Sequence, residues 1–222
     1  MTGQKTSCDC CGTCCLKGGP AMHTEDYKLI ASNVITLADL ITVRKGEYTY
    51  HPLSEDPQPA VQEFVKIRGK GSGWCCIFFD NEQSICTIYQ HRPIACRLLK
   101  CWDPEDVLAV TGKNLLNRRA LIQGNDPLAD LVCIHEDECP VSVINSLVIQ
   151  LRTPGMKNKV LAELTRLVNI DLQLREYAVR AYRLSLASEL FYFGRPLFQQ
   201  LVPFGISVFE TPDGITIQYE NI

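Results

Sequence analysis

The pattern of apolar and polar positions predicts two short helices near the N-terminus. Behind Thr24, which can cap a helix, apolar residues recur at helical spacing, namely Tyr27, Ile30, Ala31 and Val34. Thr36 and Asp39 then have the spacing of a loose capping box, which predicts a second short helix through Leu40 to about Val43. We expect both helices to serve packing.

A segment of loops and short strands follows. Residues 46–60 carry three prolines and an acidic pair, so we expect a surface loop there. The runs EFVKIRG, CIFFD and ICTIY alternate or cluster apolar residues between turn signals, which is typical of a small antiparallel sheet. DNEQ would form the hairpin turn between the last two runs. RPIACRLL has a proline near its first helical position and predicts a short helix.

From Pro140 onward the pattern becomes helical. Residues 141–151 and 160–186 contain apolar residues at helical spacings and no cysteine. The helical spacing is interrupted around residues 169–171. This region could therefore form one long kinked helix or two separate helices. The tail ISVFETPDGITIQYE alternates on both sides of TPDG and predicts a hairpin. We therefore predict an α+β fold. Residues 1–140 would form one domain with a small antiparallel sheet and short helices, and residues 141–222 a mainly helical region with a terminal hairpin.

Composition narrows the class of protein. A chain of 222 residues with 46% hydrophobic residues can bury an ordinary core without disulfide bonds. The first twelve residues carry one lysine and no apolar run, which predicts that a secretory signal peptide is absent. The longest apolar-rich run, 141–151, is shorter than the ~18 residues that span a bilayer. We expect a cytoplasmic protein with reduced thiols and no membrane partner. With a pI near 5.8 and scattered basic residues, we expect no nucleic-acid partner either.

Twelve cysteines and only four histidines are the most unusual feature of the chain. The stretch CDCCGTCC contains a CxxCxxCC pattern formed by Cys8, Cys11, Cys14 and Cys15. Two intervening residues let a loop turn both sulfurs toward one metal, and Gly12 permits backbone conformations that are closed to other residues. Zinc centres and iron–sulfur clusters both use this spacing. The adjacent Cys14 and Cys15 would project in different directions, which favours two neighbouring centres.

Further cysteines follow the predicted strands and helix. A second group consists of Cys75, Cys76, Cys86, Cys96 and Cys101. The predicted hairpin would bring several of these thiols together, and Arg92, Arg97 and Lys100 would compensate the negative charge of a thiolate centre. A last pair, Cys133 and Cys139, lies in CIHEDECP, where Pro140 follows Cys139 as a proline follows the last cluster ligand in bacterial ferredoxins.

CDCCGTCC and CIFFDNEQSICTIYQHRPIACR together resemble the YkgJ-type cysteine-cluster family, a family described as a putative zinc- or iron-chelating domain. Its motif falls on Cys8, Cys11, Cys14, Cys15, Cys76, Cys86, Tyr89, Arg92, Pro93, Cys96 and Arg97. The resemblance covers roughly residues 8–101 and implies metal chelation by an iron–sulfur or zinc centre. Some flagellin lysine methylases carry a similar arrangement. The chain departs from the family where LLKCW follows RPIACR, because the family often continues with an aromatic residue and proline.

These observations lead to a set of predicted metal ligands: Cys8, Cys11, Cys14, Cys15, Cys76, Cys86, Cys96, Cys101, Cys133 and Cys139. Cys10 and Cys75 are interpreted as spare thiols. We prefer iron–sulfur over zinc because of the CxxCxxC wrap, the proline after Cys139 and the surplus of thiols over histidines. The expected cofactor is one or two clusters of the 4Fe–4S type, with Arg92 and Arg97 beside them and zinc as the alternative.

The expected function is electron transfer or a redox accessory role with a protein redox partner. Two other interpretations stay open. One is a zinc-stabilised protein-binding module, and the other is a cluster-dependent enzyme such as a methylase-like protein. The pattern identifies no catalytic residue and does not fix the oligomeric state.

Overall fold

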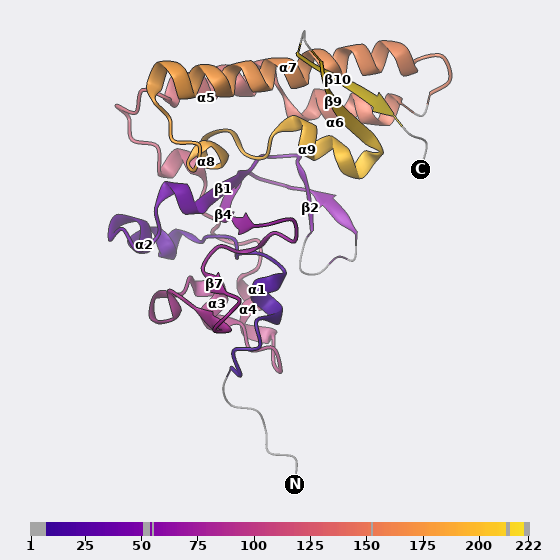
Figure 1. The fold of residues 1–222 in the computed structure, drawn as a ribbon. Coiled ribbons are helices and arrows are strands. Elements are labelled where there is room, and N and C mark those ends of the chain that lie inside the picture. The colour runs from indigo at the N-terminus through magenta and orange to yellow at the C-terminus, as the bar shows by residue number, and fades with distance from the viewer. Residues whose placement is uncertain (1–7, 51–53, 55, 152, 212–213, 220–222) are drawn as a thin grey trace.

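The cysteine-rich N-terminal segment and the long C-terminal helix lie at opposite ends of the molecule. The computed structural model describes residues 8–50, 54, 56–151, 153–211 and 214–219. In Figure 1 the chain enters at the bottom through α1 (Thr13–Leu16), and α7 (Lys157–Tyr182) crosses the top. We call the part that contains the elements from α1 to α4 the cysteine end and the part from α5 to β10 the helical end.

All strands of the described residues pair in two-stranded antiparallel sheets. The pairs are β1 (Leu40–Val43) with β4 (Phe64–Ile67), β2 (Tyr48–Tyr50) with β3 (Pro57–Pro59), β5 (Gly69–Lys70) with β6 (Cys75–Cys76), β7 (Phe79–Asp80) with β8 (Ile85–Cys86), and β9 (Ile206–Thr211) with β10 (Gly214–Tyr219). The cysteine end therefore has several small sheets where the sequence predicted one.

The helices of the cysteine end are short, whereas the helical end contains the longer helices α5, α6 and α7 together with the short α8 and α9. Besides α1 and α7 they are α2 (Tyr27–Ala31), α3 (Ile94–Leu98), α4 (Glu105–Val110), α5 (Ala129–Glu138), α6 (Val141–Gln150), α8 (Glu189–Phe193) and α9 (Leu197–Leu201). The 3-10 turns are η1 (Thr24–Asp26), η2 (Leu37–Asp39), η3 (Tyr89–His91), η4 (Arg118–Ala120) and η5 (Val202–Phe204). The predicted α+β class is confirmed, as is the terminal hairpin. In the described residues no helix has the length and apolar character that crossing a membrane requires.

Two apolar cores stabilise the molecule. The first core gathers Met22, β1, β4 and the aromatic residues of α8, and the second core lies between α6, α7, α9 and the hairpin β9–β10. Although α8 comes late in the chain, it packs on β1 in the first core, where the Thr42 hydroxyl donates to the Phe191 carbonyl at 2.5 Å. The C-terminal part of the chain thus completes the core of the N-terminal part.

The prediction of a helix over residues 40–43 is wrong, since these residues form β1. The capping box exists, because the Thr36 N–H donates to Asp39 Oδ2 at 2.8 Å, but it opens only η2. All four residues of β1 are buried, and three of them are β-branched, which favours a strand that pairs with β4. Within the predicted loop 46–60, β2 and β3 form a hairpin. Across residues 169–171 the chain stays one helix, α7.

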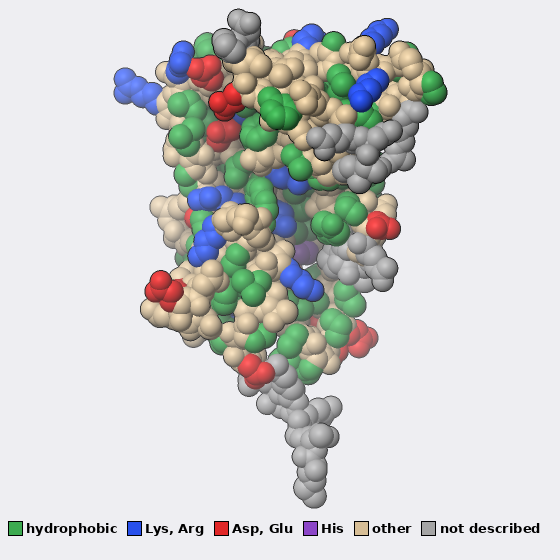
Figure 2. Space-filling view, turned by 45° about the vertical axis from the view of Figure 1, so that its right-hand side comes forward, with side chains coloured by type: hydrophobic (Ala, Val, Ile, Leu, Met, Phe, Trp, Pro, Cys, Tyr) green, Lys and Arg blue, Asp and Glu red, His purple; other side chains and the backbone are tan. Residues whose placement is uncertain are grey.

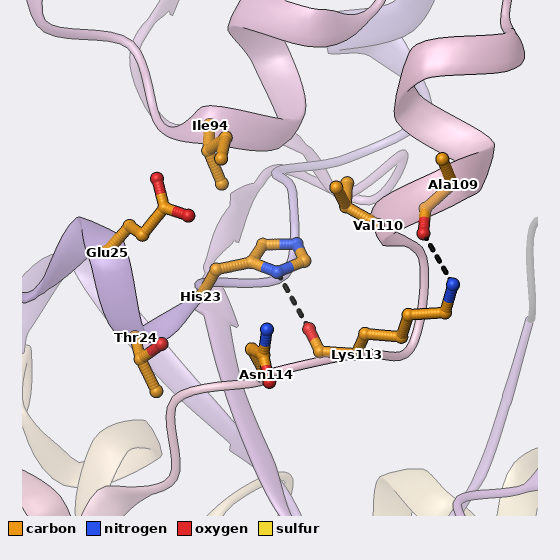
Figure 3. Close-up of a pocket in the computed structure, with 8 residues that line it drawn as sticks. All are labelled: His23, Thr24, Glu25, Ile94, Ala109, Val110, Lys113 and Asn114. Carbon is orange, nitrogen blue, oxygen red and sulfur yellow. Dashed lines mark hydrogen bonds between the residues drawn. The ribbon is translucent and has the colours of Figure 1, made fainter.

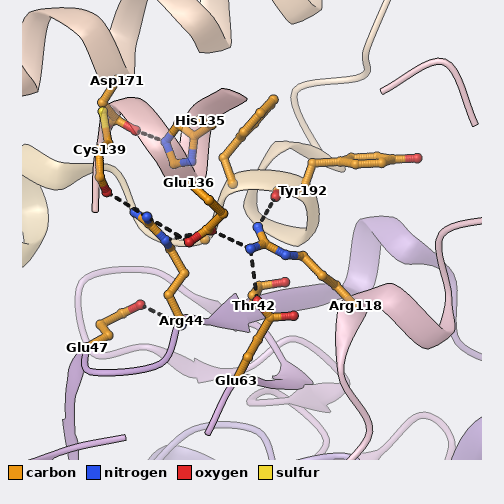
Figure 4. Close-up of polar contacts among 12 residues, drawn as sticks. Thr42, Arg44, Glu47, Glu63, Arg118, His135, Glu136, Cys139, Asp171 and Tyr192 are labelled. Carbon is orange, nitrogen blue, oxygen red and sulfur yellow. Dashed lines mark hydrogen bonds and ion pairs between the residues drawn. The ribbon is translucent and has the colours of Figure 1, made fainter. Parts of the chain in front are cut away.

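A buried ion network joins the two ends (Figure 4). Arg44 follows β1 and reaches α5, where its Nε lies 2.8 Å from Glu136 Oε1 and its Nη2 donates to the Cys139 carbonyl at 2.6 Å. Arg118 contacts the same Glu136 carboxylate and pairs with Glu63 Oε2 at 2.9 Å. Since the Arg44 and Arg118 side chains are only 1% and 2% exposed, these charges require their partners.

Candidate metal centre

A close contact places the N-terminal cysteine loop on the hairpin β7–β8. Gly12 caps α1 with φ +74°, in the left-handed region that favours glycine. A Cβ at this position would lie 2.3 Å from Cζ of the Phe79 ring, so only glycine allows this approach. Phe79 pairs directly with Cys86 in the hairpin. The loop that carries Cys11 and Cys14 therefore lies beside Cys86.

A second contact places the end of α1 against the strand that carries Cys76. The Gly18 N–H donates to the Cys15 carbonyl at 3.1 Å, and a Cβ on Gly18 would lie 3.4 Å from the Trp74 carbonyl oxygen. Trp74 directly precedes β6, and α1 packs on β6. Because β6 pairs with β5 and leads into β7, the same small framework positions Cys15, Cys76 and Cys86.

A buried carboxylate holds the helix that carries Cys96. Asp26 is 0% exposed; its Oδ1 accepts the Ile94 N–H at 2.8 Å and its Oδ2 accepts the His23 N–H at 3.0 Å. Ile94 is the first residue of α3, where the backbone N–H groups have no partner within the helix. Asp26 thus caps α3 from 68 residues away in the sequence and fixes the direction of Cys96.

Nearby thiols help to raise the pKa values of Cys15, Cys76 and Cys96, and Cys14 and Cys86 are among the thiols that act on them. We call these five the five-cysteine group: Cys14, Cys15, Cys76, Cys86 and Cys96. Cys75, the neighbour of Cys76 in β6, also acts on Cys76. Burial and then the neighbouring Cys14 thiol raise the pKa of Cys15 well above its ordinary value. Burial and then the Cys76 thiol raise the pKa of Cys96 to about 12. Thiolates gathered in this way repel one another, and a cation among them would remove that repulsion.

The five-cysteine group is gathered but not closed into a coordination shell. Cys14 Sγ and Cys15 Sγ lie 3.9 Å apart, and Cys14 is exposed, whereas Cys76 is buried. Over the described ranges, no three Cys, His, Asp or Glu side chains stand in metal-ligating geometry. Binding of a metal would therefore include side-chain rotations in the loops and short strands that carry these thiols.

Two basic side chains lie near the group. The positive charge of Arg92 opposes the raised pKa of Cys96, and that of Lys70 opposes the raised pKa of Cys76. Arg92 is held in place by stacking, since its guanidinium carbon lies 3.8 Å from the centroid of the Tyr89 ring and its Nε donates to the Tyr89 carbonyl at 3.0 Å. Arg97 is exposed on α3. Arg92 thus lies near Cys96, and a role of Arg92 and Arg97 beside a metal centre stays a prediction.

The remaining predicted ligands occupy three places: the N-terminal loop, the segment after α3, and α5 with the residue that follows it. Cys8 and Cys11 are exposed in the N-terminal loop, where Cys8 Sγ accepts the Cys10 N–H at 3.4 Å and Cys11 Sγ lies 3.3 Å from Thr13 Oγ1. Cys101 is exposed beyond α3. Cys8 and Cys11 share the loop that leads into α1 and its two cysteines. They could therefore complete the five-cysteine group or form a neighbouring centre.

Cys133 and Cys139 lie on and just after α5, in the helical end. Cys139 is 0% exposed in the second core, its Sγ lies 3.7 Å from the Leu167 carbonyl oxygen, and Figure 4 shows it beside Asp171. Burial and then the Asp171 charge raise its pKa to about 12. Cys133 is exposed. The structure does not bring these two thiols to the five-cysteine group, and their role as ligands stays a prediction.

Comparison with known families agrees with this geometry. Residues 7–114 match the family described as "CxxCxxCC: Putative zinc- or iron-chelating domain". This part of the chain is similar to a CxxCxxCC domain. No curated protein and no solved structure shows significant similarity to the chain. The match confirms the resemblance seen in the sequence and extends it past Cys101, so metal binding of the zinc- or iron-chelating type belongs to the cysteine end.

The donor set of the CxxCxxCC domain fits such a metal. Soft thiolate ligands select zinc and iron–sulfur clusters, whereas calcium and magnesium prefer oxygen. The five-cysteine group supplies thiols from four separate segments, α1, β6, β8 and α3, around one place. The sequence named these thiols from their spacing, and their role as ligands stays a prediction. It missed Asp26, whose contact with α3 leaves no local signal.

Proposed function

We propose that the CxxCxxCC domain holds an iron–sulfur cluster on its five-cysteine group and that the protein transfers electrons or serves as a redox accessory. The observation that carries the proposal is the convergence of thiols from α1, β6, β8 and α3. Four of these thiols would hold a 4Fe–4S cluster. The fifth, with Cys8 and Cys11 of the adjacent loop, would be available to a second centre.

Charge compensation supports a cluster in this place. A cluster with four thiolate ligands is usually negative, and nearby donors and cations stabilise it and raise its reduction potential. Arg92 stands beside Cys96, and the Lys70 ammonium, which donates to the Phe79 carbonyl at 2.6 Å, stands beside Cys76. When bound, the cluster would supply one-electron redox chemistry, while these side chains orient it and set its charge environment.

The surface around the group supports a protein redox partner. Large apolar side chains are exposed on each element that carries or adjoins the cysteines, namely Leu16, Trp74, Ile85 and Tyr89. Figure 2 shows hydrophobic side chains exposed over the lower part of one face. Apolar side chains grouped around a partly exposed centre are typical of a surface that another protein contacts.

The proposal is tested by reduction of protein that has been purified without oxygen. We expect visible absorption that bleaches with dithionite, returns on reoxidation and gives a paramagnetic signal in the reduced form. The matched pair Cys76→Ser and Cys75→Ser uses neighbours in β6. Cys76→Ser should lose the signal and Cys75→Ser should keep it, because Cys75 Sγ contacts the Cys76 carbonyl and Asn81 Oδ1 instead. Absorption that does not respond to reductant would contradict the redox role.

A zinc-stabilised binding module is the second candidate, and one observation favours it. β5, β6, β7 and β8 are two residues long each, and such short strands need a further constraint to stay folded. A structural zinc on four thiolates would supply that constraint without redox chemistry. Bound zinc without acid-labile sulfide, together with unfolding of the cysteine end by a chelator, would establish this function instead.

A further inference from the structure

A cavity of about 210 Å³ lies between η1, α3 and α4, and none of its printed lining residues is a cysteine. Its lining includes His23 at the N-cap of η1, Glu25 of η1, Ile94 of α3, Val110 at the end of α4 and Lys113, which follows α4. Figure 3 shows the His23 ring at the centre of these residues, with Glu25 on one side and the Lys113 side chain on the other. The side chain of His23 is 5% exposed, so the ring forms a fixed wall of the cavity.

The hydrogen bond of His23 determines which of its nitrogens can bind a ligand. Nδ1 lies 2.9 Å from the Lys113 carbonyl oxygen. Because a carbonyl oxygen only accepts, Nδ1 must carry the proton and donate. In the neutral ring Nε2 then has a free lone pair, and no residue in the described part of the chain makes a hydrogen bond to it. His23 therefore presents an acceptor to the cavity.

The two sides of the cavity carry opposite charges. Within the described residues, the Glu25 carboxylate makes no ion pair or hydrogen bond, and Figure 3 shows it directed toward the cavity. The Lys113 ammonium donates to the Ala109 carbonyl at 2.8 Å and keeps two further N–H donors. Ile94 and Val110 add an apolar wall between the two charges.

We propose that this cavity binds a small zwitterion with an ammonium group at one end and a carboxylate at the other, an amino acid in the broad sense. The ammonium group would contact Glu25 and His23 Nε2, and the carboxylate would contact Lys113. The aliphatic part of the ligand would lie against Ile94 and Val110. This binding site is separate from the thiols, so it does not depend on the metal proposed above.

The test is a titration of the full chain, labelled at histidine nitrogens, with zwitterions of increasing length: glycine, γ-aminobutyrate and ε-aminocaproate. Butylammonium and butanoate are the single-charge controls. We expect one zwitterion to shift the His23 nitrogen signals and to bind more tightly than both controls. Glu25→Gln and Lys113→Met should each weaken it about fivefold, the size of an exposed ion pair. Glu105→Gln on α4, outside the cavity lining, should leave the affinity unchanged.

Three results would overturn the proposal. No shift of the His23 signals with any probe would mean that the cavity holds water only. Equal affinity for butylammonium or butanoate would mean a site for one charge. Unchanged affinity in both Glu25→Gln and Lys113→Met would place the zwitterion elsewhere. Since Glu25 and Lys113 are exposed, these variants are expected to fold and the titration to remain decisive.

Discussion

The two ends of the molecule are stabilised in different ways. The helical end is built on α7, a helix of 26 residues whose buried face, with residues such as Val160, Leu164 and Leu167, packs in the second core. In the cysteine end, β1 and β4 share the first core with α8, but the thiols sit on two-residue strands and on helices of four and five residues. The proposed metal would stabilise these thiol-bearing elements, whereas α7 is already held by its apolar core.

The ion network between the ends explains why they still form one molecule. Arg44 and Arg118 come from the N-terminal part of the chain, and both converge on Glu136 of α5. A buried charge without its partner is costly, so the arginines of one part and the Glu136 carboxylate of the other each need the opposite charge. Loss of the metal should therefore loosen the thiol-bearing elements first and leave the network in place.

The largest effect is expected for Cys96→Ser. This variant should lose the metal centre, whose binding can contribute on the order of 10 kcal/mol to folding of a thiolate site. Hydrogen exchange should then show loss of protection in β6, β8 and α3, while α7 keeps its protection. Cys10→Ser, at an exposed thiol interpreted as spare, is the control and should keep its metal. Full metal content in Cys96→Ser would contradict the claim that the two ends are stabilised in different ways.

A smaller effect is expected where the two ends meet. Glu136→Gln leaves Arg44 buried without its carboxylate partner and leaves Arg118 with Glu63 alone, which should lower the free energy of unfolding by about 3–5 kcal/mol. The control is Glu163→Gln, which removes an exposed pair with Arg166 on α7 and should cost less than about 1 kcal/mol. Denaturant unfolding measures both. Equal losses in the two variants would show that burial of the network does not matter.

The cap on α3 should affect metal affinity without removal of a ligand. Asp26→Asn replaces the carboxylate that accepts the Ile94 and His23 N–H groups, so α3 should be held less firmly. We expect about tenfold weaker metal binding, in the range for groups that orient ligands. Asp39→Asn removes a comparable cap on η2, which carries no cysteine, and should leave affinity unchanged. Competition with a chelator measures both, and identical affinities would exclude a positioning role for Asp26.

The smallest effect is a dependence of stability on pH. Burial alone would raise the pKa of Glu136, but Arg44 and Arg118 outweigh it and hold this pKa below the ordinary 4.5. The unfolded chain therefore takes up a proton at higher pH than the native protein. The resulting stability is present above 4.5 and is lost as the pH falls through the native pKa. Thermal unfolding between neutral and acid pH should show a shallower decline in Glu136→Gln. Identical declines would contradict this assignment.

Local features could be predicted from the sequence, and contacts between distant segments could not. The C-terminal hairpin, α3 behind Pro93 and the thiol spacing all follow from neighbouring residues. The predicted helix over residues 40–43 was wrong because the capping box was taken to open a helix through these residues. Their burial against β4 and α8 favours a strand instead. Asp26 and Glu136 were missed because their partners lie far away in the sequence, up to 92 residues for Arg44. The sequence named the five thiols as candidate ligands, but their grouping depends on how Gly12 and Gly18 pack.

The central claim, that the cysteine end is built around a thiolate metal centre, is tested most directly by iron, zinc and acid-labile sulfide content per chain after purification without oxygen. Iron with equimolar sulfide, bound to wild type and lost in Cys96→Ser, is the result we expect. Zinc without sulfide would keep the centre and replace the redox role. A protein free of both metals whose β6, β8 and α3 amides remain protected from exchange would contradict the account.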